Sequence, residues 1–415
     1  MSKVDEPGPD TAEVAMRRQR MLAVGVLTLV MLTSYTYVIP VFASRICQVF
    51  SLSVEQYGTM IGLGSLSQIA SLLLVGLMIT HFGVRRISEF SLVGIGGCFA
   101  LIGFGGNLSS LKGSLAINGF FSGLVKVAIP GFLISLYPTL KRRIISVQLV
   151  TVAVAGIVIP LWANQLLQWS EGDDYSEFPH VFFGPFLIIG CIVIIGGILL
   201  SLGQQLPLED PQITSAKIFL RELFEHRSLT IVLLVALHTS ADGTIFQFLP
   251  MFMQHHFDEL PLAPAWALSG HAIAYVVTRV ILSLLPEGFG QRAILTLAGP
   301  IGGFLILLML WQGHAFSVPF LYTLASLFYA AEFPVLVSEI SSRSIGHFGT
   351  ILASGLLVSN AATFLFLKGT GRLIDTTSDY RVALSVAACG FIAFGVMAAV
   401  TRLGKAPLTR SPVSP

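Results

Sequence analysis

The sequence predicts an all-α membrane protein with twelve transmembrane helices in two pseudo-symmetric halves of six. Composition is the first reason: of 415 residues, 54% are hydrophobic and 11% are charged, with a mean hydropathy of +0.81, whereas about 25% of a soluble domain is charged. The second reason is a series of long apolar segments, each near the roughly 20 residues that cross a bilayer. The net charge of +2 excludes the strongly basic surface of a nucleic-acid binder.

Twelve segments have the length and hydropathy of membrane spans. In chain order they are 21–43, 57–79, 88–106, 113–138, 144–167, 181–203, 228–254, 262–286, 293–312, 317–340, 346–367 and 383–402. Residues 1–16 are polar, and three arginines precede the first span. We therefore expect that span to remain in the mature protein rather than to be cleaved as a signal peptide.

Lysine and arginine are distributed unequally between the predicted loops. If both termini are cytoplasmic, the inside segments contain 17 of the 24 Lys and Arg residues and the outside segments contain five. The outside loops at 168–180 and 255–261 contain acidic residues and neither Lys nor Arg. Because positive residues favour the cytoplasmic side, we expect both termini in the cytoplasm. The short loops favour a bacterial cell (inner) membrane.

The longest inside loop divides the chain near its midpoint. We expect an N-terminal tail, a six-helix bundle, a central loop, a second six-helix bundle and a C-terminal tail. Their bounds are 1–20, 21–203, 204–227, 228–403 and 404–415.

The two predicted bundles share short sequence patterns at a nearly constant offset. Phe82-Gly83-Val84-Arg85 follows the second span, and Phe289-Gly290-Gln291-Arg292 follows the eighth, 207 residues later. Pro130 and Pro334 are 204 residues apart, and Pro40 and Pro250 are 210 apart. Each pair falls on equivalent spans, which indicates a duplicated six-helix unit.

The loop after the second span resembles a signature of the major facilitator superfamily, roughly G-x-x-x-D-R-x-G-R-[RK]. Here it reads Gly76-Leu-Met-Ile-Thr80-His81-Phe82-Gly83-Val84-Arg85-Arg86. The resemblance implies a transporter fold whose helices 1, 4, 7 and 10 line a central cavity. It also implies a loop that latches an inner gate, which here is weaker because Thr80 and His81 replace the charged pair. The candidate gating residues are Gly76, Gly83, Arg85, Arg86, Gly290 and Arg292.

Four charged residues lie within predicted spans: Lys126, Asp242, Arg279 and Glu332. A charge at mid-bilayer costs about 2.5–3.5 kcal/mol on insertion scales, so such residues usually face a cavity. His238 precedes Asp242 by four residues, on the same helical face. Asp242, His238 and Glu332 are therefore the candidates for carrying a coupling proton. The alternative is that these charges only neutralise one another.

Lys126 and Arg279 are the candidates for binding an anion. Arg279 resembles the carboxylate-binding arginine of the monocarboxylate and oxalate/formate branch of the superfamily. His271 and Tyr275 lie on the face of Arg279, and Tyr35, Asn118 and Gln247 are further hydrogen-bonding candidates. The alternatives are an inner-gate role for Arg279 and helix–helix contacts for the other residues.

These features predict a secondary active transporter that works by alternating access, is coupled to protons and moves a small polar solute, foremost an organic anion. Proton-driven efflux of amphipathic or cationic compounds, and a sugar-type permease, are the alternatives. Motifs of hydrolases, nucleotide binding and zinc catalysis are absent from the sequence, so we expect no enzymatic activity, no cofactor and no metal. The expected partners are the solute, the proton gradient and the lipid bilayer, with no nucleic acid, and we expect a monomer.

Overall fold

The computed structural model describes residues 36–136, 141–169, 184–202, 226–257, 262–286, 289–312, 314–343 and 348–401. Most of these residues are helical, and none of them lies in a strand. Tyr35, most of the central loop and both predicted tails lie outside them, so the bounds predicted for the two bundles stay a prediction.

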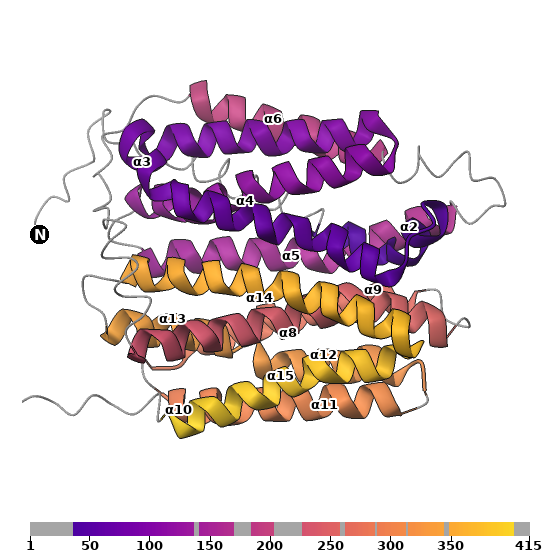
Figure 1. Cartoon of the computed structure of the whole chain (residues 1–415). Coiled ribbons are helices and arrows are strands. Elements are labelled where there is room, and N and C mark those ends of the chain that lie inside the picture. The colour runs from indigo at the N-terminus through magenta and orange to yellow at the C-terminus, as the bar shows by residue number, and fades with distance from the viewer. Residues whose placement is uncertain are drawn as a thin grey trace, which may run out of the picture. The chain divides into compact units, whose positions relative to one another are not determined.

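Figure 1 labels the helices of the described residues. Their bounds are α2 Ala43–Val49, α3 Val54–Gly105, α4 Leu108–Leu136, α5 Lys141–Trp169, α6 Gly184–Leu202, α8 His226–His256, α9 Ala263–Leu284, α10 Gln291–Ala293, α11 Gly299–Trp311, α12 Ser317–Tyr329, α13 Glu332–Arg343, α14 Phe348–Thr377 and α15 Tyr380–Val400. A π-helical segment, η2, covers Ile294–Ala298. Among the described residues, seven helices are long and apolar enough to cross a membrane, and two shorter apolar helices accompany them.

Helix α3 contains both the second and the third predicted span, with a kink between them at Gly83. The backbone there has φ 79° and ψ 153°, and Gly290 before α10 has φ 65°. The two glycines that match in the sequence repeat therefore both adopt a left-handed φ, which side chains with a Cβ rarely adopt. A Cβ at either position would meet nothing within 4 Å, so backbone conformation, not crowding, requires glycine.

The tenth predicted span, 317–340, is broken near its middle. Helix α12 ends at Tyr329 and α13 begins at Glu332. Pro334 lies in the first turn of α13, where a missing backbone N–H breaks no helical hydrogen bond. The break places the Glu332 carboxyl group at a helix N-terminus within an apolar span, where the helix dipole favours negative charge.

The chain forms two compact units. One contains 67–155 and the described part of 173–213, and the other contains 36–66, 156–172 and the described residues after 214. In the first unit, Val75, Ile79 and Ile87 of α3 pack on Leu124 and Ala128 of α4. In the second, α8 packs against α14 and α15, and α11 packs against α12 and α15; Figure 1 shows these helices.

Within the second unit, the end of α14 contacts the beginning of α3. The Asp375 carboxylate accepts hydrogen bonds from the backbone N–H groups of Val54, at 3.0 Å, and Glu55, at 2.8 Å. A Cβ at Gly371 would lie 2.5 Å from the Val54 carbonyl oxygen, so glycine permits this approach. Asp375 therefore satisfies two of the N–H groups that a helix N-terminus leaves unpaired.

Candidate functional site

His238 and Glu332 form a buried pair in the second unit. Nδ1 of His238, on α8, lies 2.7 Å from Oε2 of Glu332, the first residue of α13. The exposed fractions of the two side chains are 3% and 0%. The second carboxyl oxygen, Oε1, has no hydrogen-bond partner among the described residues, and a Cβ at Gly299 would lie 2.4 Å from it. The pair can hold a proton between two side chains out of contact with water.

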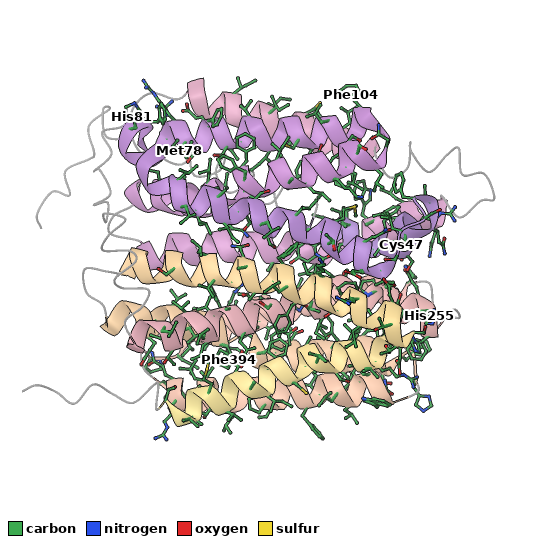
Figure 2. The ribbon with its side chains drawn as sticks, viewed as in Figure 1. Cys47, Met78, His81, Phe104, His255 and Phe394 are labelled. Atoms are coloured by element: carbon green, nitrogen blue, oxygen red, sulfur yellow. The ribbon has the colours of Figure 1, made fainter. Side chains whose placement is uncertain are left out.

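Aromatic rings surround the His238 imidazole. Phe333 stacks on it at 6.4 Å between ring centroids, and Tyr329, Phe391 and Phe394 contact it at other angles. Phe394 is labelled in Figure 2. This apolar shell isolates the pair and strengthens electrostatic interactions within it.

Asp242 has different partners from His238, although the two lie one turn apart on α8. The Tyr275 hydroxyl donates a hydrogen bond of 2.8 Å to Oδ2 of Asp242. The Arg279 guanidinium lies over the Tyr275 ring, 4.9 Å from its centroid. Oδ1 of Asp242 has no hydrogen-bond partner among the described residues. Tyr275 thus connects an acidic side chain of α8 with a basic side chain of α9.

His271 lies next to Tyr275 on α9, with 4.4 Å between the ring centroids. Its Nδ1 atom lies 3.0 Å from the Ser326 hydroxyl and 3.1 Å from the Tyr329 hydroxyl. Tyr322 stacks on its ring at 5.3 Å. Tyrosine rings from α9 and α12 therefore surround one imidazole, and two hydroxyl groups of α12 contact its Nδ1 atom. The sequence pattern on α9 alone did not predict this arrangement.

Gln247 and Tyr37 supply further polar groups in the second unit. The Gln247 carbonyl oxygen has no hydrogen-bond partner within the described part of the chain. Tyr37 is buried and packs edge-on against Phe246, with 5.3 Å between ring centroids. A Cβ at Gly156 would lie 2.4 Å from the Tyr37 hydroxyl oxygen. Tyr35, a predicted hydrogen-bonding residue, lies outside the described residues.

Lys126 belongs to the first unit, where it lies on α4 with an exposed side chain. Its Nζ atom donates a hydrogen bond of 2.8 Å to Oε1 of Gln68 on α3. The sequence analysis missed Gln68, although a glutamine inside an apolar span is itself a signal. Asn118, two turns before Lys126, is fully buried and accepts a weak hydrogen bond from Ser122 at 3.5 Å.

The predicted gating residues occupy the two matching turns. Gly76 lies in α3, Gly83 forms its kink, and Gly290 precedes α10. Nε of Arg85 forms an ion pair of 2.6 Å with Glu89 on the same helix. Arg86 and Arg292 are exposed. Their part in a gate stays a prediction.

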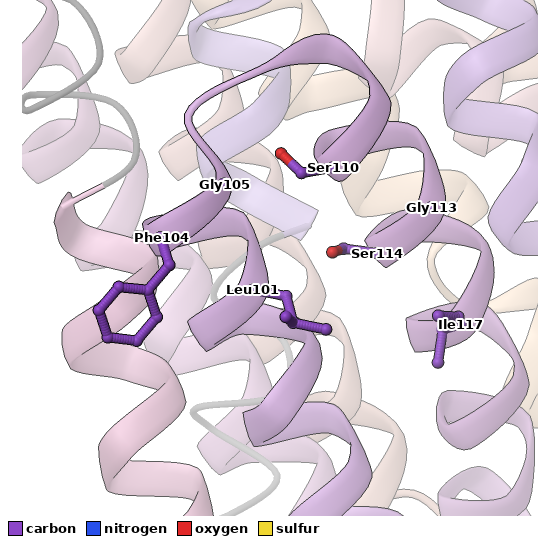
Figure 3. Close-up of a pocket in the computed structure, with 7 residues that line it drawn as sticks. All are labelled: Leu101, Phe104, Gly105, Ser110, Gly113, Ser114 and Ile117. Atoms are coloured by element: carbon purple, nitrogen blue, oxygen red, sulfur yellow. The ribbon is translucent and has the colours of Figure 1, made fainter.

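The pocket of about 320 Å³ in Figure 3 does not involve the predicted site residues. It lies in the first unit, between the end of α3 and the start of α4, with Phe104, Ser110 and Ile117 among its lining. Within the described residues, no cluster of three or more His, Cys, Asp and Glu side chains could hold a metal ion.

Comparisons with known proteins agree on one family. The family model described as Major Facilitator Superfamily matches residues 24–366. The structure of a bacterial homologue of the human lysosomal transporter Spinster, inward-facing and occupied, aligns with a TM-score of 0.75 at 15% identity, over 94% of this chain and 99% of the other. The transporter FucP in its outward conformation aligns with a TM-score of 0.67 at 16% identity, over 93% and 99%. Curated protein sequences yield no match.

Proposed function

Because the chain belongs to the Major Facilitator Superfamily, we propose that it is a proton-coupled secondary transporter of small organic anions. The family and fold make it an integral, multi-pass membrane protein with twelve helices in two halves, built for transport. The anion, the proton coupling, a monomeric state and cytoplasmic termini in a cell (inner) membrane belong to the proposal.

The observation that carries the anion proposal is the environment of Lys126. Its side chain is exposed inside a predicted span, and its hydrogen-bond acceptor is the neutral amide of Gln68. Among the described residues, no carboxylate forms an ion pair with Lys126. A positive charge without a compensating negative group in an apolar span favours an anionic ligand. In the second unit, Arg279 is a separate candidate for binding an anion, because a guanidinium group can bind a carboxylate by two hydrogen bonds.

The coupling proposal rests on the two acidic side chains of the second unit. Asp242 and Arg279 both contact Tyr275, so a proton on Asp242 removes a negative charge from the surroundings of Arg279. An anion then binds more favourably when Asp242 is protonated. The His238–Glu332 pair, within the same helix bundle, is a second group that can hold the coupling proton while the anion is bound. Proton and anion are then released together on the other side of the membrane.

One observation favours a sugar-type solute as the second candidate. Oδ1 of Asp242 and Oε1 of Gln247 are acceptors without partners among the described residues. Sugar hydroxyls would donate hydrogen bonds to both, and aromatic rings such as Tyr275 would pack on a sugar face. Efflux of a lipophilic cation is the third candidate, with Asp242 as its counter-ion.

A thermal-unfolding screen of the purified protein in detergent tests this assignment. The probes are lactate, succinate and gluconate for anions, fucose and xylose for sugars, and tetraphenylphosphonium for cations. A ligand at 100 times its Kd stabilises the folded state by about 2.7 kcal/mol. We expect stabilisation by at least one carboxylate, lost in Lys126→Gln and Arg279→Gln and kept in Lys112→Gln, a control on the same helix. Stabilisation by sugars or the cation alone would contradict the anion proposal.

A further inference from the structure

The partner of Lys126 is chemically unusual for a lysine inside an apolar span. A buried or partly buried cation is ordinarily compensated by a carboxylate. Here the acceptor is the amide oxygen of Gln68, at 2.8 Å. The amide holds the ammonium group by a hydrogen bond and leaves its unit charge in place.

Gln68 is buried where α3 packs against α4. Gln68 is 6% exposed, and the Ser71 hydroxyl donates a hydrogen bond of 2.9 Å to the backbone carbonyl oxygen of Gln68. A Cβ at Gly123 would lie 1.9 Å from the Ser71 hydroxyl oxygen and 3.3 Å from the Gln68 carbonyl oxygen. Glycine at 123 therefore lets α4 approach α3 closely, three residues before Lys126. This close contact brings Lys126 within hydrogen-bonding distance of Gln68.

We propose that Gln68 is a specificity-determining residue, which positions the Lys126 ammonium group and, by being neutral, reserves its charge for an anionic solute. The inference rests on the proposed function, since it assigns the reserved charge to the anion. A glutamate side chain at position 68 has almost the same shape and length as glutamine. Its carboxylate would form an ion pair with Lys126 and remove the charge that an anion needs. Selection between anions and uncharged solutes thus depends on one amide.

The test compares Gln68→Glu with Gln68→Met in the full-length protein. Gln68→Glu keeps the shape and compensates the charge, whereas Gln68→Met removes the hydrogen bond and keeps the charge. The ligand readout is the apparent Kd for lactate, succinate and gluconate from thermal unfolding. The second readout needs no ligand. Acetic anhydride acetylates only uncharged amines, so the rate of acetylation of Lys126 reports how much of its amine is uncharged. Mass spectrometry measures this rate, with the rate at Lys112 as the internal reference.

We expect Gln68→Glu to weaken carboxylate binding at least tenfold and to slow acetylation of Lys126 at least fivefold, because the ion pair keeps the amine protonated. Gln68→Met should weaken binding only two- to fivefold. Elution as a single folded species, and an unchanged acetylation rate at Lys112, show that each variant folds.

Wild-type carboxylate affinity in Gln68→Glu would overturn the inference, as would a tenfold loss shared equally by Gln68→Met. If the wild type binds no carboxylate, the proposed function fails and the specificity role fails with it. Slower acetylation in Gln68→Glu would then support only the positioning of Lys126 by Gln68, and an unchanged rate would overturn that as well.

Discussion

The Nδ1 atom of His238 lies 2.7 Å from the Oε2 atom of Glu332, and this pair joins two helices across 94 residues of sequence. Glu332 begins a half-helix inside an apolar span, and its other carboxyl oxygen is unpaired among the described residues. Neither side chain has access to water as an alternative partner, and we propose the pair as a carrier of the coupling proton.

Replacing Glu332 by Gln should separate binding from coupling. The amide keeps the shape and a hydrogen bond to His238 but cannot exchange a proton. We expect the carboxylate Kd to change less than threefold, while proton movement driven by carboxylate in proteoliposomes falls at least tenfold. Glu339→Gln, on the same helix, is the matched control and should keep proton movement. Equal loss of binding and proton movement in Glu332→Gln would argue against a coupling role.

The positive φ at Gly83 and Gly290 predicts a cost for substitution at two distant positions. Gly290 has the left-handed helical conformation, which costs an L-residue about 1–2 kcal/mol. Gly83 has ψ 153°, a region that only glycine readily adopts, where strain costs about 1–3 kcal/mol. Gly290→Ala and Gly83→Ala should lower the free energy of unfolding by these amounts. Gly97→Ala in α3 is the control, because a Cβ there meets nothing within 4 Å and φ is not positive. Denaturant titration in mixed micelles measures all three. An unchanged free energy of unfolding in either alanine variant would contradict the need for glycine at that turn.

Replacing Asp375 should destabilise the protein at the contact between α14 and α3. It accepts hydrogen bonds from the backbone of Val54 and Glu55, and removing a capping side chain costs about 0.5–2 kcal/mol. Asp375→Ala should therefore lower the free energy of unfolding within that range, and Asp375→Asn by less, because its carbonyl oxygen still accepts one bond. Hydrogen exchange at residues 54–57 should rise in Asp375→Ala. Unchanged exchange there would show that the cap contributes nothing.

Cys47, on α2 beyond the first predicted span, should be a poor nucleophile. Burial, with a smaller contribution from the Asp375 carboxylate, raises the pKa of its thiol from 9.0 to about 12. Because the thiolate is the reactive form, the alkylation rate by iodoacetamide should still rise about tenfold per pH unit between pH 8 and pH 10. The unfolded protein should instead level off near pH 9. A plateau near pH 9 in the folded protein would contradict the raised pKa.

The sequence predicted the features that local patterns determine. Hydropathy identified the apolar spans, and the matching Phe-Gly segments identified two turns that share a left-handed glycine. Glu332 and His238 were both recognised because a charge or an imidazole in an apolar span is conspicuous. The pattern also predicted that His271, Tyr275 and Arg279 follow one face of a helix, and successive side chains do contact one another.

The sequence did not predict features of two other kinds. Some depend on contacts between distant segments, and others disappear when hydropathy is averaged over a window. Hydropathy is averaged over a window, so it cannot locate the break at Ala330 and Ala331. The spacing on α8 placed His238 beside Asp242, but long-range packing gives His238 a partner on α13. Gln68 was missed because a neutral amide is less conspicuous than a charge, although it directly binds Lys126.

The most direct test of the account is carboxylate-dependent proton movement into proteoliposomes that enclose a pH-sensitive dye. Succinate and gluconate are the probes, because both cross lipid slowly, and protein-free liposomes give the background. We predict that adding one of them outside acidifies the lumen of vesicles with the wild-type protein and not with Lys126→Gln. Acidification by fucose or xylose with no response to either carboxylate, or an equal carboxylate response in Lys126→Gln, would contradict proton-coupled anion transport.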